Sequence, residues 1–277
     1  MAEPFQEQGG ASTMDPGRVR RWLTSRVMTR LCRPERMARL RAKAEQRRKR
    51  AGQRHVVEVF YQPDDSYSHL LAQVLPAFAA RYDVELICHL VAGPGGRNVP
   101  EPELLTRLSR YDARCIAPGY GLTFPGRDDA PPPAALSELA GSVLGGLDNT
   151  AFVENVAAVG RALWSEDELA MSALAETLGR APKDAVTARF EAGNTRRAEL
   201  GHYAGGMLYY AGEWYWGVDR LYHLEERLAA LGADRSPGER PLVQRPVIDG
   251  GPLRDDGSLT LEVFPSLRSP YTAISFD

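Results

Sequence analysis

The 277-residue sequence predicts an α/β fold with an all-helical insertion. Three observations lead to this prediction. A strand–helix–strand pattern covers residues 56–91, helical patterns follow one another over residues 134–200, and an aromatic hairpin at residues 207–216 is followed by a further helix. A strand–helix–strand unit with so short a connection implies two parallel strands.

The elements before the insert follow from the spacing of their apolar residues. Residues 56–61 are apolar and rich in β-branched types, which favours a strand. The pattern breaks at residues 63–65, and apolar residues at helical spacing then predict a helix over residues 66–82. Residues 84–91 predict the second strand, and residues 102–113 predict a helix that leads towards the insert.

The insert is predicted to be all-helical, because turn signals separate its apolar repeats and no strand pattern interrupts them. Its helices are expected at residues 134–147, 151–163, 166–178 and 183–200. Residues 207–210 and 213–216 then read as two short strands, with Ala211 and Gly212 as a two-residue hairpin connection. A last helix is expected at residues 219–231, with an acid in its first turn that suits the helix dipole.

An N-terminal extension, residues 1–54, precedes this fold and is strongly basic. Residues 18–54 hold 15 Lys and Arg against two acids, although the whole chain has a formal net charge of −2. Apolar residues repeat every four positions over residues 19–31, which predicts a basic helix, and Pro34 predicts a kink or a restart. We expect this arm to contact an acidic surface. The alternatives are the acidic body of the chain itself, a partner or membrane surface, and nucleic acid.

The cysteines and the hydropathy indicate the cellular compartment of the protein. Cys32, Cys88 and Cys115 are odd in number and form no C-x-x-C pair, which favours a reducing compartment, so we expect a cytoplasmic protein. No apolar run is long enough to span a membrane, and the N-terminus lacks the apolar segment of a secretory signal. The histidines have no ligand spacing, so no metal site is predicted.

Residues 65–68 read Asp-Ser-Tyr-Ser at the turn into the first predicted helix. This turn resembles the active-site turn of DsbA-family thioredoxin-fold proteins, and it is most similar to the 2-hydroxychromene-2-carboxylate isomerase and kappa-class glutathione transferase branch, which has S-P-Y-S there. Asp65 replaces the first serine or cysteine. The resemblance implies that residues 55–232 have a thioredoxin-like fold with a helical insert, that glutathione is a cofactor, and that Asp65, Ser66 and Ser68 form a catalytic turn. Helix capping is the alternative role of these three residues.

The hairpin region carries the second part of the resemblance. The matching residues are Gly212, Glu213, Trp216, Gly217, Asp219, Arg220 and Leu221. Relatives have a cis-proline before the first hairpin strand that presents its backbone to a thiol or to glutathione, and this position falls at Gly206. In glutathione-binding relatives the G-x-D pattern kept by residues 217–219 holds the γ-glutamyl end. The resemblance therefore implies glutathione contacts at Gly206, Met207, Val218 and Asp219, with helix capping as the alternative role of Asp219.

The end of the chain repeats its beginning. Residues 261–276 align without gaps on residues 57–72 with four identities, at the strand and the turn. The turn of this second copy begins at Ser269 and reads Ser-Pro-Tyr-Thr, so the resemblance implies that Ser269 acts towards the glutathione sulfur. We expect residues 233–257 to be a linker and residues 258–277 to be the start of a second thioredoxin-like domain in a tandem protein.

Three functions stay open at this point. The first is a glutathione-linked isomerase or transferase acting on a small molecule, with a degenerate first domain and catalysis in the second copy. The second is a thiol–disulfide oxidoreductase, which the family name suggests although the sequence has no C-x-x-C. The third is a non-catalytic thioredoxin-like domain that pairs with a catalytic copy or binds a partner through its basic arm.

Overall fold

The structure is a computed structural model that describes residues 17–31, 33–95, 99, 101–245, 258, 260 and 262–263. It divides into two compact units, one of residues 41–247 and the other of residues 1–40 with residues 248–277. Apart from four positions, the predicted second copy lies outside the described residues, and so does Ser269.

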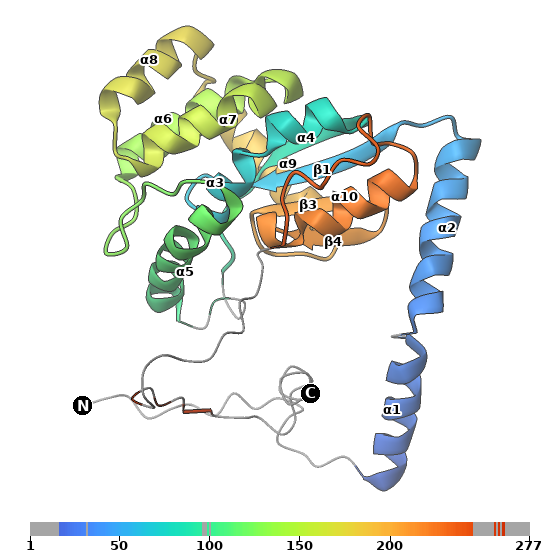
Figure 1. Cartoon of the computed structure of the whole chain (residues 1–277). Coiled ribbons are helices and arrows are strands. Elements are labelled where there is room, and N and C mark those ends of the chain that lie inside the picture. The colour runs from blue at the N-terminus through green and yellow to red at the C-terminus, as the bar shows by residue number, and fades with distance from the viewer. Residues whose placement is uncertain are drawn as a thin grey trace. The chain divides into compact units, whose positions relative to one another are not determined.

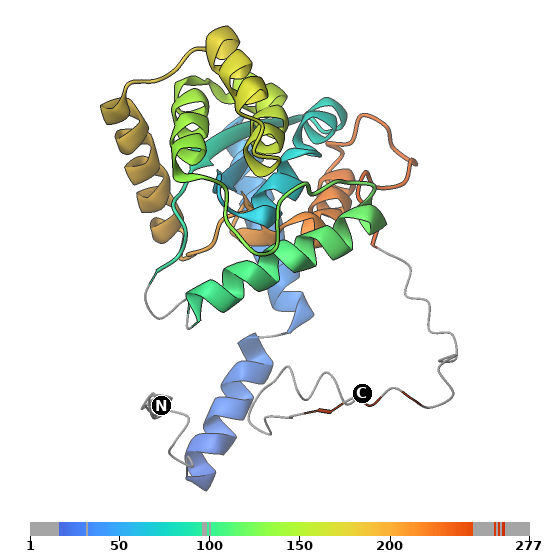
Figure 2. The ribbon, with the colours of Figure 1, turned by 90° about the vertical axis from the view of Figure 1, so that its left-hand side faces the viewer.

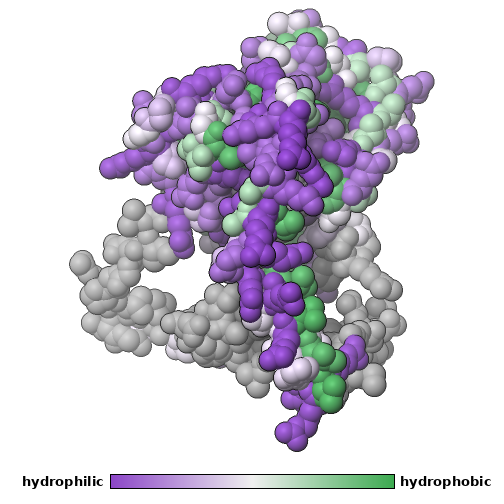
Figure 3. All heavy atoms as spheres, turned by 90° about the vertical axis from the view of Figure 1, so that its right-hand side faces the viewer, coloured by the Kyte–Doolittle hydropathy of each residue, from purple (hydrophilic) through white to green (hydrophobic). Residues whose placement is uncertain are grey.

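Two helices form the basic arm, α1 (Arg18–Leu31) and α2 (Pro34–Arg50). The predicted restart at Pro34 is confirmed, because proline lacks an N–H and suits the first position of a helix. Hydrophobic side chains gather along one side of α1 (Figure 3), which carries five arginines and no acid. None of the described helices is long and apolar enough to cross a membrane.

An ion pair joins the second half of α2 to the domain, although we predicted the whole of residues 1–54 as an extension. Arg41 donates from Nε to Oε1 of Glu213 at 2.8 Å and from Nη2 to Oε2 at 2.6 Å. Nη1 of the buried Arg227 lies 2.8 Å from the same Oε1. A bidentate pair of this kind fixes orientation as well as distance, so residues 41–50 belong to the domain's own compact unit.

Within the described residues, four strands form one sheet in the order β2–β1–β3–β4. The strands are β1 (His55–Tyr61), β2 (Val84–Leu90), β3 (Met207–Tyr210) and β4 (Glu213–Trp216). β1 runs parallel to β2 and antiparallel to β3, and β3 pairs with β4 as a hairpin. Ala211 and Gly212 have φ values of 46° and 92°, as a two-residue connection requires.

Two of the predicted helices are divided. We predicted one helix over residues 66–82, but the structure has α3 (Ser66–Ala72) and α4 (Leu75–Arg81). Pro76 explains the break, because it has no N–H to donate to the carbonyl of Ala72. The helix predicted over residues 219–231 is likewise a short 3-10 turn, η3 (Val218–Arg220), followed by α10 (Leu221–Ala230).

Between β2 and β3, the regular elements of the described residues are all helices. They are α5 (Pro102–Ile116), the 3-10 turn η2 (Ala117–Tyr120), α6 (Ala134–Gly146), α7 (Asn149–Trp164), α8 (Glu168–Leu178) and α9 (Lys183–Glu199), and the predicted insert begins with α6. A parallel β–α–β half precedes these helices in the sequence and an antiparallel β–β–α half follows them, and the two halves join in one sheet with the helices packed around it (Figures 1 and 2). This is the predicted thioredoxin-like fold with an all-helical insertion.

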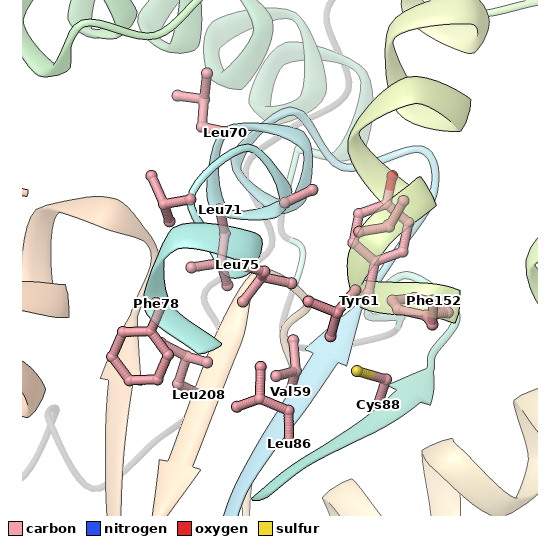
Figure 4. Packing of buried hydrophobic residues seen from close by; sticks show 14 of the residues in the cluster. Val59, Tyr61, Leu70, Leu71, Leu75, Phe78, Leu86, Cys88, Phe152 and Leu208 are labelled. Carbon is pink, nitrogen blue, oxygen red and sulfur yellow. The ribbon is translucent and has the colours of Figure 1, made fainter. Parts of the chain in front are cut away.

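Different helices cover the two faces of the sheet, because successive side chains of a strand point to opposite sides. Val59 and Tyr61 of β1 pack with residues of α3, α4, α7 and α10 in the main core (Figure 4). Glu58 and Phe60 point to the other face, where α9 supplies Arg196 as a partner of Glu58. The predicted site turn lies between β1 and α3, at the end of the central strand.

Candidate functional site

The turn between β1 and α3 is closed by its own side chains. Asp65 is the N-cap of α3, and its Oδ2 accepts hydrogen bonds from the backbone N–H and from Oγ of Ser68, both at 2.7 Å. The N–H of Gln62 donates to Oγ of Ser68 at 3.1 Å. The position in front of the helix N-terminus, where an external anion would bind, therefore holds the carboxylate of Asp65.

The carboxyl group of Asp65 is largely buried, and this sets its ionisation. Burial raises the pKa of Asp65 to about 6, and the negative charge of Asp64 adds to the rise, while the hydrogen bonds from Ser68 oppose it. At neutral pH the group is therefore mainly ionised. A thiolate placed beside it would meet a like charge, which raises the pKa of the thiol instead of lowering it.

Two glycines pack over this turn at the position of the relatives' proline. Gly206 has φ +63°, and a Cβ added to it would lie 3.0 Å from Oδ2 of Asp65 and 3.1 Å from N of Ser68. A Cβ on Gly205 would lie 2.5 Å from Cβ of Gln62. Proline, whose ring fixes φ near −65°, does not fit the backbone of Gly206, so glycine serves close packing here.

Three other predicted site residues are held by packing. Oγ of the buried Ser66 donates to the carbonyl of Ser109 at 3.0 Å, which ties α3 to α5. The side chain of Met207 is buried on the α9 side of the sheet, and that of Val218 is buried in the main core. Met207 and Val218 thus have only backbone groups to offer a ligand.

Asp219 lines a pocket of about 440 Å³ next to the turn. The other lining residues are Tyr67, Asp112, Ile116, Tyr120, Trp216, Gly217 and Val218. The hydroxyl of Tyr67 donates to Oδ2 of Asp112 at 2.7 Å and so orients this carboxylate. The second carboxylate of the pocket belongs to Asp219, whose side chain is 47% exposed. Partial burial and the charge of Asp112 raise the pKa of Asp219, against the effect of Arg220. Two carboxylates of this kind favour a cationic ligand group.

Asp219 is not the N-cap residue of η3 or of α10. The N-cap residues of η3 and α10 are Gly217 and Arg220, and neither cap has a side-chain hydrogen bond. The alternative that the sequence left open for Asp219 is therefore not realised. Its carboxylate stays available to the pocket, with Nε of Arg220 at 3.7 Å from Oδ2.

A second pocket of about 750 Å³ begins at Asp64 on the same turn. It lies between the end of β2, the loop containing Pro131 and Pro132, and the helices α6 and α9. Its lining is mainly apolar, with polar groups from Asp64, Glu138 and Lys183 among others. An apolar cleft with a few polar groups is typical of sites for small organic molecules.

The described cysteines do not contribute to the turn. Cys88 lies in β2 and faces the main core, where burial raises its pKa to about 12 and makes the thiol unreactive. Cys115 is exposed on α5. Within the described ranges, no group of three or more His, Cys, Asp or Glu side chains could hold a metal ion.

The sequence did not single out Asp112 or the buried ionic cluster of Glu58. Asp112 meets Tyr67 only because α5 packs on α3, and the two residues are far apart in the chain. On the α9 face, Glu58 accepts a bidentate pair from Arg196 at 2.7 and 2.8 Å and lies 3.0 Å from Nε2 of His89. An acidic residue inside an apolar strand was the one available signal for this cluster.

No family model and no curated protein match this sequence. Among solved structures, the chain is similar to a 2-hydroxychromene-2-carboxylate isomerase, with 19% identity and a TM-score of 0.48 over 64% of this chain and 96% of that chain. It is also similar to the cytosolic disulfide reductase DsbM from Pseudomonas aeruginosa, with 18% identity and a TM-score of 0.41 over 64% of this chain and 97% of that chain.

Proposed function

We propose that residues 55–232 form a binding domain of the glutathione-linked isomerase and transferase type, which holds its ligand without activating a thiol. The observation that carries this proposal is the carboxylate of Asp65, which takes both hydrogen bonds from Ser68 at the start of α3. A ligand thiolate would compete with a built-in anion for the same donors and would be repelled by it.

The pocket of Tyr67, Asp112 and Asp219 supports a γ-glutamyl compound such as glutathione as the ligand. The α-amino group of the γ-glutamyl residue is a cation at neutral pH, and two carboxylates line this pocket. The ligand's neighbouring α-carboxylate would find the guanidinium of Arg220, which lies beside Asp219. Hydrogen bonds between charged groups contribute about 1.5–3 kcal/mol each, which is enough for recognition of one end of a tripeptide.

We place the apolar part of a small-molecule co-substrate in the pocket at Asp64. Lys183, which also lines this pocket, could bind a carboxylate of the co-substrate. Thiol–disulfide exchange is less well supported, because the turn carries no thiol and the thiol of Cys88 is buried. In a tandem protein the isomerase chemistry would then belong to Ser269 of the second copy, with residues 55–232 as its binding partner.

Calorimetry with glutathione and S-methylglutathione tests the proposal. The two ligands share the γ-glutamyl end and differ only at the sulfur, so we expect affinities within a factor of about three of each other. Asp219→Asn should weaken both at least about tenfold, because it removes a charged partner of the amino group. Asp65→Asn, which keeps a capping side chain, serves as the matched control and should change binding of S-methylglutathione little.

Two results would contradict this function. Absence of glutathione binding in the full chain at millimolar ligand would remove the ligand assignment. Strong preference for glutathione over its S-methyl derivative, together with a thiolate ultraviolet absorbance on binding, would mean that the turn does activate a thiol.

A further inference from the structure

Helix α5 exposes its apolar side. The exposed fractions are 62% for Leu104, 44% for Leu105, 56% for Leu108 and 56% for Tyr111. The helix lies on the outside of the domain (Figure 2), and no described element covers these side chains. Adjacent exposed apolar side chains on a folded domain mark an interaction site.

The opposite side of α5 is the one that faces the domain, and it is partly polar. Arg110 is buried and donates from Nε and Nη2 to the carbonyl of Asp128 at 3.2 and 3.0 Å. The carbonyl of Ser109 accepts from Ser66, and Ala113 is fully buried. A surface helix normally buries its apolar stripe and exposes its polar side. In α5 this arrangement is reversed, so its leucines do not serve the packing of this domain.

The exposed stripe has the spacing of a helix–helix seam. Leu104, Leu108, Tyr111 and Cys115 follow one another at intervals of four, three and four residues. Apolar residues at this spacing line the narrow seam along which two helices pack as a coiled coil. The occupant that fits such a seam is therefore another helix, not an extended peptide or a flat surface.

We propose that α5 pairs in parallel with α5 of a second copy of this chain. Arg107 and Asp112 flank the seam on its two sides, at positions that parallel helices bring together between partners. Two-fold symmetry makes this ion pair twice. An antiparallel pair would instead bring Arg107 towards Arg114, with like charges. Arg107 forms no hydrogen bond or ion pair with any other residue in the described part of the chain.

This pairing would bring the second copy to the edge of the Asp219 pocket. Asp112 lines that pocket, and its Oδ2 accepts from Tyr67, which leaves Oδ1 for Arg107 of the second copy. The net charge of the pocket, and with it the affinity for a cationic ligand group, would then depend on the dimer. The dimer itself rests on the α5 surface alone and does not require glutathione as the ligand.

Cys115 gives a direct test of the parallel arrangement. Helix axes 8–10 Å apart bring facing Cα atoms in the seam to about 5 Å, within reach of a disulfide. In an antiparallel pair centred on the stripe, the two Cys115 residues would be about 16 Å apart. Diamide, a two-electron oxidant, should therefore link the two thiols: each loses a proton, a sulfur–sulfur bond forms, and the azo group is reduced to a hydrazine.

Sedimentation velocity of the full chain is the first measurement. We expect a concentration-dependent dimer that Leu108→Glu weakens at least about tenfold, because the change places two carboxylates in the seam. Leu169→Glu alters a leucine of α8 that is 86% exposed, so it is the matched control and should leave the dimer unchanged. A monomer at all concentrations up to about 100 μM, well above a typical micromolar Kd, would overturn the proposal.

Cross-linking is the second measurement, in a Cys32→Ser background in which the exposed Cys115 and the buried Cys88 are the remaining cysteines of the sequence. Diamide should produce a disulfide-linked dimer there and none after Cys115→Ser. A dimer that never cross-links through Cys115 would overturn the parallel arrangement.

Discussion

Replacing Asp65 with asparagine should stabilise the domain at neutral pH, and the gain should depend on pH. Burial raises the pKa of Asp65 from its ordinary value of 3.8 to about 6. The folded state therefore binds a proton more tightly than the unfolded state, and stability falls as pH rises from about 4 to about 6. One pKa unit corresponds to about 1.4 kcal/mol, so the shift sets an upper bound of about 3 kcal/mol.

The expected gain is smaller than this bound, because Asp65 keeps some exposure to water and asparagine loses the charge that strengthens the hydrogen bonds from Ser68. We expect Asp65→Asn to raise the free energy of unfolding by about 1–2 kcal/mol at pH 8 and by close to nothing at about pH 4. Asparagine caps helices about as well as aspartate, so the bond from the Ser68 N–H should persist. Urea denaturation of both proteins at closely spaced pH values measures the difference.

Asp148→Asn is the matched control, because Asp148 is an exposed N-cap that accepts from the N–H of Ala151 at 2.9 Å. Its difference from the unmodified chain should stay within about 0.5 kcal/mol over the same range, since the two caps are equivalent. A gain for Asp65→Asn that is equal at every pH, or a loss at pH 8, would refute the account of the turn given above.

Gly206→Ala should lower the free energy of unfolding by about 1–3 kcal/mol, because φ is +63° and a Cβ would lie 3.0 Å from Oδ2 of Asp65. Glu58→Gln should lower the free energy of unfolding by about 2–3 kcal/mol at pH 7. Although burial opposes it, the bonds from Arg196 and a histidine lower the pKa of Glu58 to about 2, so this stability is present above about pH 4.5 and lost as pH falls to about 2. Tyr67→Phe should weaken glutathione binding about three- to tenfold by releasing the carboxylate that it orients.

Each of these changes has a control in the same chain. Gly212→Ala also meets a positive φ but has open space around it, so Gly206→Ala should cost more. Glu176→Gln on the exposed side of α8 should leave the stability curve nearly unchanged. If Glu58→Gln destabilises equally at pH 3 and pH 7, the pair with Arg196 is not the cause. Unchanged binding by Tyr67→Phe would separate Asp112 from ligand recognition.

The elements with local signals could be predicted from the sequence. Ala211 and Gly212 mark the hairpin turn, and the alternating aromatic residues on either side give β3 and β4 their observed bounds. The cap at Asp65 is also local, because its partner Ser68 is three residues away. The division of the first helix was missed because its apolar spacing continues across the break at Gln73.

The rest of the site depends on contacts between segments far apart in the chain. Asp112 reaches Tyr67 only after α5 packs on α3, and no spacing rule joins two residues separated by a strand and a loop. Gly206 could be placed at the relatives' proline position, but its approach to Asp65 needed the fold. The burial of Asp65, which sets its pKa, likewise depends on tertiary packing and could not be predicted from the sequence.

The pairing of β1 with β3 governs when this domain can fold. Glu58 pairs with Tyr209, so the centre of the sheet joins segments about 150 residues apart with the whole helical insert between them. At about 5–20 residues per second, β3 is synthesised about 8–30 s after β1. The insert helices, whose contacts are nearer in sequence, can form during that interval. The apolar central strand meanwhile lacks one of its neighbours, which makes the nascent chain dependent on protection from aggregation until the hairpin has been made.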